Sequence, residues 1–337
     1  MNVAWNEVSR VLVVKLAHLG DVLLAAPVVS VLKQRLPHAE VDALVYADTA
    51  SMLSGHPDLA QLHAINGKEL ALFRRLRSRR YDLMVALSDK PRIAWLARLL
   101  GVRYAVSRDR SDRPDLWRRS FTHFYNVPPG NTRHTVEVHL DALRALGIEC
   151  RPTPIVLEPG EEARRRVASL GLPAGYIVVH PASRWLFKCW PAERMAALIN
   201  QLQARGERIV LTGSPSREEN ALVEGVLRDL EKPVINLVGK LSLKELAALI
   251  GGAKLFIGVD SAPMHMASAM GTPAVVLFGP SGEIEWSPWQ VPHRIVVSRH
   301  SCRPCGYAGC GDGGRSECVE TIPVAAMLAA VDGLAHG

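Results

Sequence analysis

Residues 11–37 read VLVVKLAHLGDVLLAAPVVSVLKQRLP, an apolar run followed by a helical pattern. Its first six residues are apolar apart from Lys15, which is typical of a parallel strand buried on both faces. An apolar pattern with helical spacing then runs from about residue 22 to residue 36 and stops at Pro37. The stretch therefore predicts a buried strand that leads through a short loop into a helix.

The same alternation of apolar runs and helical patterns continues through the first half of the chain. A helical pattern at residues 134–147 ends at Gly147, a common residue at helix C-termini. Residues 151–175 are rich in proline, glycine and charge, which is typical of a linker. The further strands predicted in this half are 41–46, 62–65, 81–87 and 103–107.

A second alternating series begins after this linker. It predicts strands at 176–180, 208–212, 234–238, 255–259 and 274–278, and helices at 191–205, 217–230, 242–250 and 263–270. Such alternation is typical of a parallel sheet covered by helices on both faces. We therefore predict an α/β fold with two Rossmann-like, doubly wound parallel-sheet domains in tandem. Because ligands bind outside the carboxyl ends of parallel strands, two such sheets facing each other would form a cleft for two substrates.

The composition is that of a globular protein, with 48% hydrophobic and 22% charged residues among 337. No apolar run approaches the roughly 18 residues that span a bilayer. Residues 1–10 lack the basic start and the apolar stretch of a signal peptide. These features predict a cytoplasmic protein.

The formal net charge of +7 favours anionic partners such as phosphates, nucleic acid or an acidic membrane surface. Two interpretations of the arginine-rich stretches in the first half are open. They are either solvated helix faces or a surface that contacts phosphorylated substrate or anionic lipid headgroups. The arginines concerned are Arg74, Arg75, Arg77, Arg79, Arg80, Arg103, Arg108, Arg110, Arg113, Arg118 and Arg119.

The first candidate site follows the first strand and spans residues 15–21, KLAHLGD. Gly20 permits a tight turn and a close approach of the backbone. Asp21 lies at the start of the next predicted helix, where two roles are open and compatible. It is an N-cap, or it is a general base that removes a proton from an acceptor hydroxyl.

The second candidate site, residues 180–191 (HPASRWLFKCWP), follows the first strand of the second series. Lys188 lies just before Pro191, which suits the first turn of the following helix. A lysine and a helix N-terminus can together hold a phosphate. The alternative is a surface lysine between packed aromatic side chains.

The third candidate site, residues 258–267 (GVDSAPMHMA), is again a strand that runs into a helix. Asp260 and Ser261 are residue types that cap helices, and backbone N–H groups there would point towards a ligand. His265 lies one turn into this helix and, taken alone, is better explained as a structural histidine. The next strand ends in the small-residue loop 278–282.

Four of the six cysteines lie close together near the end of the chain, in the pattern C-x2-C-x4-C-x7-C. Four cysteines match the ligand number of a structural zinc site, although this spacing is irregular for zinc ribbons. A metal site and a loop of free thiols are both open. The cysteines are Cys302, Cys305, Cys310 and Cys318.

Several nucleotide-binding and hydrolase motifs are absent. No G-x-G-x-x-G follows the first strand of either half, which argues against a dehydrogenase. No G-x-x-x-x-G-K-[ST] occurs, which argues against a P-loop NTPase. Phosphate binding would then depend on helix N-termini and one lysine.

Together these motifs resemble the heptosyltransferases of lipopolysaccharide core assembly, in glycosyltransferase family 9. The opening segment VLVVKLAHLGDVLLAAPVV is similar to the family's K-x-x-x-x-GD start. HPASRWLFKCWP and GVDSAPMHMASAMGTPAVVLFGP are similar to its donor-domain signatures. The SRWLFKCW version and the CRPCGYAGC tail look most like the heptosyltransferase III branch.

The resemblance implies a GT-B fold with an acceptor-binding domain at residues 1–158 and a nucleotide-sugar domain at residues 170–337. The last helix is expected to pack back on the N-terminal domain. The implied reaction is an inverting transfer of heptose from ADP-L-glycero-D-manno-heptose to a heptose of the lipopolysaccharide inner core. No cofactor, metal or nucleic acid is implied, and the protein would act at the cytoplasmic face of the inner membrane.

The resemblance also assigns roles to individual residues. Asp21 corresponds to the proposed catalytic base and Lys188 to the lysine that contacts the donor phosphates during catalysis. The family often has Thr-Gly after its aspartate, whereas this chain has Ser-Ala-Pro. The implied donor-binding residues are Ser183, Lys188, Asp260, Ser261, Ala262 and His265, and the implied acceptor-binding residues are Lys15, His18 and Gly20. Two alternatives remain: a GT-B transferase with another nucleotide sugar, and an inactive homologue that binds a nucleotide sugar.

Overall fold

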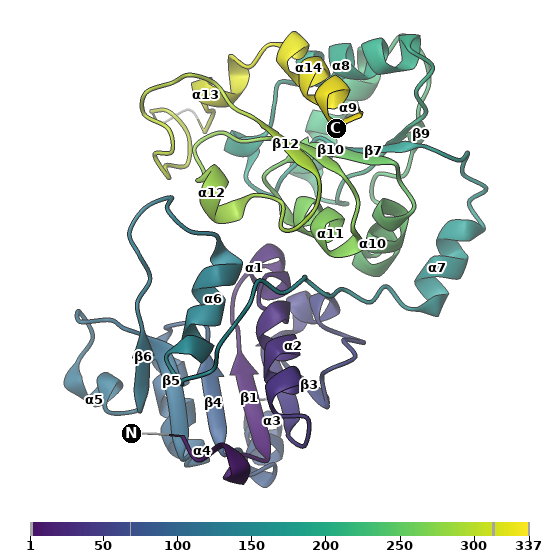
Figure 1. Cartoon of the computed structure of the whole chain (residues 1–337). Helices are drawn as coiled ribbons and strands as arrows, with labels where there is room; N and C mark the ends of the chain where they lie inside the picture. Colours follow the sequence, from purple (N-terminus) through teal and green to yellow (C-terminus); the bar gives the residue numbers. More distant parts are fainter. Residues whose placement is uncertain (1–2, 68, 312–313, 336–337) are drawn as a thin grey trace. The chain divides into compact units, whose positions relative to one another are not determined.

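The computed structural model describes residues 3–67, 69–311 and 314–335 (Figure 1). The chain divides into two compact units, Met1–Glu158 and Pro159–Gly337. The boundary falls within the proline- and glycine-rich stretch 151–175. Among the described residues, no helix has both the length and the apolar composition needed to cross a membrane.

The first unit is built on a six-stranded parallel sheet. Its strands are β1 (Arg10–Val14), β2 (Glu40–Tyr46), β3 (Gln61–Ile65), β4 (Leu83–Ala86), β5 (Tyr104–Arg108) and β6 (His123–Tyr125). They pair in the order β3-β2-β1-β4-β5-β6, with every neighbouring pair parallel. The strand order therefore reverses between β1 and β4, which is the position where doubly wound sheets bind ligands.

Helices cover both faces of this sheet. They are η1 (Trp5–Glu7), α1 (Leu19–Leu23), α2 (Ala26–Arg35), η2 (Ala47–Met52), α3 (Glu69–Ser78), α4 (Pro91–Leu100), α5 (Asp115–Arg118) and α6 (Thr135–Arg144). In Figure 1, α2 and α6 lie on the near side of the sheet, and the two helices contact each other. Buried side chains of α3, α4 and the α5 region share one apolar cluster with β1, β2, β4 and β5. These three helices therefore cover the opposite face.

The second unit repeats this topology. Its strands are β7 (Ile177–His180), β8 (Ile209–Leu211), β9 (Ile235–Asn236), β10 (Leu255–Val259), β11 (Ala274–Leu277) and β12 (His293–Val296). They pair in the order β12-β11-β10-β7-β8-β9, again all parallel. Read from the β9 edge, the order is β9-β8-β7-β10-β11-β12, which is the arrangement of the first sheet with β7 in the place of β1. The strand order therefore reverses between β7 and β10.

The helices of the second unit flank this sheet. They are α7 (Glu161–Ala168), η3 (Leu186–Lys188), α8 (Ala192–Ala204), α9 (Arg217–Arg228), α10 (Leu243–Gly251), α11 (Ala262–Met270), α12 (Glu283–Trp286), α13 (Glu317–Glu320) and α14 (Val324–Ala335). The last helix, α14, packs against β12, α8 and β11 within its own unit.

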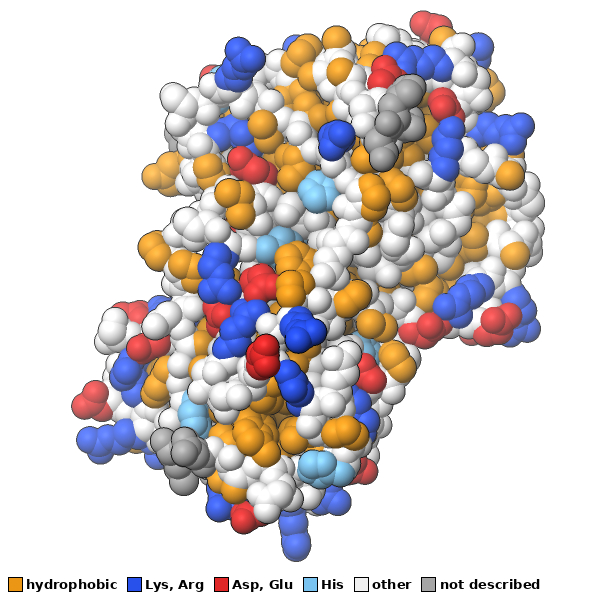
Figure 2. Space-filling view, viewed as in Figure 1, with side chains coloured by type: hydrophobic (Ala, Val, Ile, Leu, Met, Phe, Trp, Pro, Cys, Tyr) orange, Lys and Arg blue, Asp and Glu red, His pale blue; other side chains and the backbone are white. Residues whose placement is uncertain are grey.

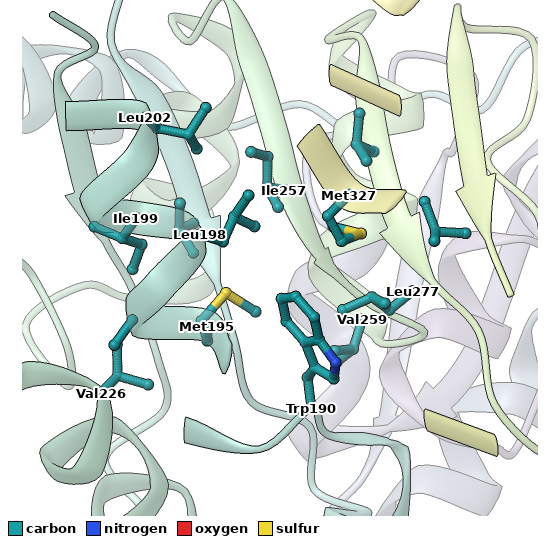
Figure 3. Close-up of a cluster of buried hydrophobic side chains, with 14 of the residues drawn as sticks. Trp190, Met195, Leu198, Ile199, Leu202, Val226, Ile257, Val259, Leu277 and Met327 are labelled. Atoms are coloured by element: carbon teal, nitrogen blue, oxygen red, sulfur yellow. The ribbon is translucent and has the colours of Figure 1, made fainter. Parts of the chain in front are cut away.

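The core of the second unit forms where α8 meets β10 (Figure 3). Met195 and Leu198 of α8 pack there with Ile257 and Val259. Trp190 is also buried, and its indole Nε1 donates a hydrogen bond of 3.1 Å to the carbonyl of Ile322. Burial of one such side chain contributes roughly 1.5–3 kcal/mol. The loop that contains Lys188 therefore ends on a fixed anchor two residues later.

The structure corrects the predicted helix at residues 22–36. The segment forms two helices, α1 and α2, and α1 begins at Leu19. Pro27 lies in the first turn of α2, where its missing N–H costs nothing, but it could not continue a helix from α1.

Two strands, β6 and β12, are not among those predicted from the sequence. Both are short and lie at an edge of their sheet. Edge strands are covered on fewer sides, and their residues therefore need not form an apolar run.

Candidate functional site

The candidate residues lie at the two points where strand order reverses. Lys15 to Asp21 follow β1, and Ser183 to Lys188 follow β7. Asp260 directly follows β10, the strand that pairs with β7. Each sheet thus carries one group of candidate residues at the position where open parallel sheets bind ligands.

In the first unit, Lys15 is the centre of a polar cluster. It is only 8% exposed. Its Nζ lies 3.3 Å from Asp21 Oδ1, 3.0 Å from His139 Nε2 and 3.4 Å from the carbonyl oxygen of Leu87, which follows β4. The cluster therefore joins the ends of β1 and β4 to α6.

His139 is a member of this cluster that the sequence analysis missed. Its Nδ1 lies 3.0 Å from the carbonyl oxygen of Leu24, which can only accept a hydrogen bond. Nδ1 therefore donates, and Nε2 presents a lone pair to the Lys15 ammonium group. Burial, reinforced by the charge of Lys15, lowers the pKa of His139 well below its usual value, which keeps the ring neutral. The only sequence signal was a histidine between Val136, Leu140 and Leu143 on the apolar stripe of α6.

Two opposing effects act on the pKa of Lys15. Burial lowers the pKa of its ammonium group, and the nearby carboxylate of Asp21 opposes that shift. Its donors point to Asp21 on one side and to the His139 lone pair on the other. Lys15 therefore fixes the Asp21 carboxylate while about a quarter (27%) of that side chain stays exposed.

The structure corrects two expectations for this segment. Asp21 is not the N-cap of its helix, because His18 occupies the N-cap position and Asp21 is the third residue of α1. Gly20 does not form a tight turn before the helix, because it is the second residue of α1. The Asp21 carboxylate still lies in the first turn, where the helix dipole favours negative charge.

In the second unit, Lys188 and Asp260 form an ion pair at the reversal point. Lys188 Nζ lies 2.6 Å from Asp260 Oδ2. The Asp260 side chain is 6% exposed and the Lys188 side chain 20% exposed. The carboxylate thus holds the lysine in place while part of the ammonium group can reach an anion.

The N-terminus of α11 lies directly after Asp260. Ser261 is the N-cap residue, and its hydroxyl donates to the carbonyl of Val259 at 3.2 Å. It makes no cap hydrogen bond to α11 in the described part of the chain. Pro263 has no N–H, and the N–H of Met264 donates to the carbonyl of Ser261 at 3.1 Å. The N–H groups of Ser261 and Ala262 therefore remain suited to binding an anion beside Lys188.

The other two predicted donor-site residues are buried in the same unit. The backbone N–H of Ser183 donates to Cys189 Sγ at 3.2 Å, and its hydroxyl accepts from the N–H of Trp185 at 3.3 Å. Burial raises the pKa of the Cys189 thiol to about 12, which makes it a poor nucleophile. His265 is 3% exposed, and its ring centroid lies 6.4 Å from that of Trp286.

The cysteine segment packs on the loop that follows β11. The Arg303 side chain donates to the carbonyl of Gly279 at 2.7 Å, and the N–H of Gly306 donates to the carbonyl of Pro280 at 2.9 Å. Within the described ranges, no three histidine, cysteine or acidic side chains are grouped as metal ligands would be. Cys302, Cys305, Cys310 and Cys318 are all free thiols.

The chain matches the family model of glycosyltransferase family 9 (heptosyltransferase) over residues 69–313. It is 39% identical over 286 residues to lipopolysaccharide heptosyltransferase 3 of Escherichia coli (strain K12), covering 80% of this chain and 82% of that protein.

Two solved structures have the same fold. The family 9 glycosyl transferase of Veillonella parvula DSM 2008 has a TM-score of 0.83 at 24% identity, covering 97% of both chains. Heptosyltransferase WaaC of E. coli, solved with ADP-2-deoxy-2-fluoro heptose, has a TM-score of 0.72 at 21% identity, covering 96% of this chain and 99% of that one. The predicted GT-B fold is thereby confirmed, and the chain belongs to glycosyltransferase family 9, the heptosyltransferases.

Proposed function

We propose that this protein transfers L-glycero-D-manno-heptose from ADP-heptose to a heptose of the lipopolysaccharide inner core, with inversion at the anomeric carbon. The observation that carries the proposal is the Lys188–Asp260 ion pair, which lies beside a helix N-terminus at the reversal point of the second sheet. Membership of the family and the similarity to heptosyltransferase 3 support heptose as the transferred group.

The donor is assigned to the second unit. Lys188 binds the diphosphate, and the backbone N–H groups of Ser261 and Ala262 at the start of α11 bind a second oxygen of the same group. Asp260 positions Lys188 through their 2.6 Å contact. Ser183 stabilises the loop before Lys188 through its hydrogen bonds to Cys189 and Trp185. His265 belongs to α11, the helix whose N-terminus binds the diphosphate. WaaC, solved with an ADP-heptose analogue, supports ADP as the nucleotide.

The acceptor is assigned to the first unit. Asp21 accepts the proton of the acceptor hydroxyl, because its carboxylate is partly exposed and is held by Lys15. The His18–Gly20 segment binds the sugar next to this carboxylate. Lys15, predicted to bind the acceptor, is instead buried with its donors directed at Asp21, His139 and Leu87, and it contributes by holding Asp21. His139 acts as a positioning residue, because it orients the Lys15 ammonium group.

The reaction is a single displacement. The acceptor oxygen loses its proton to Asp21 and forms a bond to the anomeric carbon, while the bond from that carbon to the ADP oxygen breaks. Lys188 and the α11 N-terminus stabilise the negative charge that develops on ADP. These fixed positive groups do the work that a metal ion does elsewhere, so we propose that no metal or cofactor is required.

Because a lipopolysaccharide acceptor is anchored in lipid, we propose that the reaction takes place at the cytoplasmic face of the inner membrane. The net charge of +7 suits such an anionic surface.

Two measurements test this proposal: the preference of the protein among nucleotide sugars, and the affinity of a Lys188 variant for ADP. ADP-heptose should raise the melting temperature of the protein, whereas UDP- and GDP-sugars at equal concentration should not. Lys188→Gln should weaken ADP binding by roughly tenfold or more, because a hydrogen bond to a charged group contributes about 1.5–3 kcal/mol.

The matched control is Lys254→Gln. This substitution also removes a lysine from an ion pair, with Glu207, but on an exposed surface of the same unit. Its affinity for ADP should equal that of the wild type. Equal protection by UDP- or GDP-sugars, or an unchanged ADP affinity of Lys188→Gln, would contradict the donor assignment.

A further inference from the structure

One helical layer of the first unit has an unusual outer surface. The inner sides of α3 and α4 pack on the sheet through residues such as Leu72, Leu76, Ile93 and Ala97. On α4, the exposed residues Arg92, Trp95 and Leu99 are spaced three and four apart, so they form one outward stripe. We call the outer side of this layer the α3–α5 face, defined by Leu70, Arg74, Arg77, Trp95, Leu99 and Leu116.

Large apolar side chains are exposed on this face. Leu70 is 65% exposed, Trp95 55%, Leu99 57% and Leu116 54%. A hollow of about 250 Å³ lies between α4 and α5, with Trp95, Leu116 and Trp117 in its lining. Single exposed apolar residues are common, but a tryptophan and a leucine on one stripe, beside an apolar hollow, suggest a contact surface.

Positive charge is concentrated in the part of the sequence that contains this layer. Residues 69–119 contain 14 Lys and Arg and 6 Asp and Glu, a net charge of +8, whereas the whole chain has +7. The rest of the chain is therefore slightly acidic. Nine arginines here form no ion pair with any carboxylate that the structure describes: Arg74, Arg75, Arg77, Arg80, Arg92, Arg98, Arg108, Arg113 and Arg119.

The opposite side of this unit is different. On and near α6, Arg133 and Arg144 pair with Glu137 and Asp141 at 2.6–2.7 Å in their closest contacts. Figure 2 views the molecule from that side and shows Lys and Arg side chains interspersed with Asp and Glu. Arginines without a carboxylate partner are thus concentrated in residues 69–119, whereas those around α6 are paired.

We propose that the α3–α5 face binds the surface of an anionic phospholipid bilayer. Arginines without carboxylate partners attract lipid phosphates, each contributing about 1 kcal/mol near such a surface. Trp95 and Leu99 insert at the headgroup level, where tryptophan is favoured because its ring is amphipathic. The inference extends the proposed function, on which it rests for its biological setting, by naming the surface that brings the enzyme to its lipid-anchored acceptor.

Vesicle flotation tests this assignment with the full-length protein. The wild type should bind phosphatidylglycerol–phosphatidylethanolamine vesicles and not pure phosphatidylcholine vesicles, and high salt should weaken the binding. Arg74→Ala with Arg77→Ala should lower the partition coefficient by about fivefold for each arginine removed. Trp95→Ser with Leu99→Ser should also lower it, while the far-ultraviolet circular dichroism stays unchanged.

Matched controls lie in the second unit. Arg217→Ala with Arg228→Ala removes two exposed arginines of α9, and Tyr307→Ser removes an aromatic side chain that is 73% exposed. Both control variants should bind vesicles as the wild type does. Wild-type binding by the α3–α5 face variants would overturn the proposal. So would a change of oligomeric state in those variants without a loss of vesicle binding, since a second copy would then cover the face.

The readouts separate this inference from the proposed function. Flotation needs no turnover, so vesicle binding can succeed even if no heptose is transferred. Conversely, the face variants should transfer heptose normally to a deacylated, water-soluble acceptor and more slowly to the same acceptor embedded in vesicles. If the face variants transferred heptose as fast as the wild type to both acceptors, the proposed membrane-binding surface would be contradicted. The proposed transferase activity would not be affected.

Discussion

At the residue scale, each unit places a lysine–carboxylate pair where its strand order reverses. Lys15 pairs with Asp21 at 3.3 Å, and Lys188 pairs with Asp260 at 2.6 Å. The pairs differ in which member is more exposed. In the first pair the carboxylate is the more exposed group, which suits proton acceptance, and in the second it is the lysine, which suits anion binding.

The sequence indicated these residues because they follow apolar runs that had to be buried strands. It could not indicate His139, since its partners Lys15 and Leu24 lie more than 100 residues away along the chain. It also gave no sign of the buried network around Asp42. There, burial raises the pKa of the carboxyl group, but hydrogen bonds from His63, Arg79 and Tyr81 lower it by more.

The buried histidines predict a pH dependence of stability. Burial lowers the pKa of His180 to about 4, and its Nδ1 lies 2.9 Å from the Thr212 hydroxyl. Between pH 6.5 and about 4 the unfolded chain binds a proton at this position and the folded protein does not. The free energy of unfolding should therefore fall by about 1.4 kcal/mol per pH unit as the pH drops through this window. His139 acts in the same direction.

Urea unfolding of the wild type and of His180→Asn between pH 4.5 and 7.5 measures this effect. Asparagine keeps a donor for the Thr212 hydroxyl but does not titrate, so its stability should depend less steeply on pH. Identical slopes for the two proteins would mean that His180 does not contribute.

At the element scale, the strand–loop–helix units were predictable and their irregularities were not. The long central strands are recognisable in the sequence as apolar runs, because both faces of the sheet are covered. The edge strands β6 and β12 do not, and the break between α1 and α2 depends on the backbone around Pro27. The cap of α1 at His18 was missed because histidine is not a typical N-cap residue.

Gly279 lies in a close contact between the loop after β11 and α13. A Cβ added at Gly279, after β11, would lie 2.2 Å from Val319 Cγ2 of α13. Gly279→Ala should therefore lower the free energy of unfolding by about 1–3 kcal/mol, as overpacking does. Thermal or urea denaturation measures the change.

The second variant in this experiment is Gly279→Ala with Val319→Ala, which removes the clashing methyl group and should recover part of the loss. Gly333→Ala, in helix α14, meets no atom closer than 3.6 Å and serves as the control without a clash. An unchanged stability of Gly279→Ala would show that the loop and α13 are not in contact as described.

At the scale of the whole molecule, the chain uses one topology twice and gives its two copies different chemistry. The tandem doubly wound sheets were predicted from the two alternating series, and family membership and the structural neighbours bear that fold out. Positive charge is concentrated in the first unit, where the acceptor is assigned. Sequence alone indicated this concentration but could not show which arginines lack carboxylate partners, since pairing depends on the fold.

In the proposed mechanism, Asp21 of the first unit acts as the base and Lys188 of the second binds the donor, so heptose transfer tests both assignments at once. The measurement is mass spectrometry of a truncated core acceptor incubated with ADP-heptose and the enzyme. The wild type should add one heptose, and Asp21→Asn should be slower by about 10²–10⁴-fold, since a general base contributes that much. Asp48→Asn, a carboxylate in the first turn of η2, should react at the wild-type rate. Absence of the heptosylated product with the wild type, or near-normal turnover by Asp21→Asn, would contradict the account.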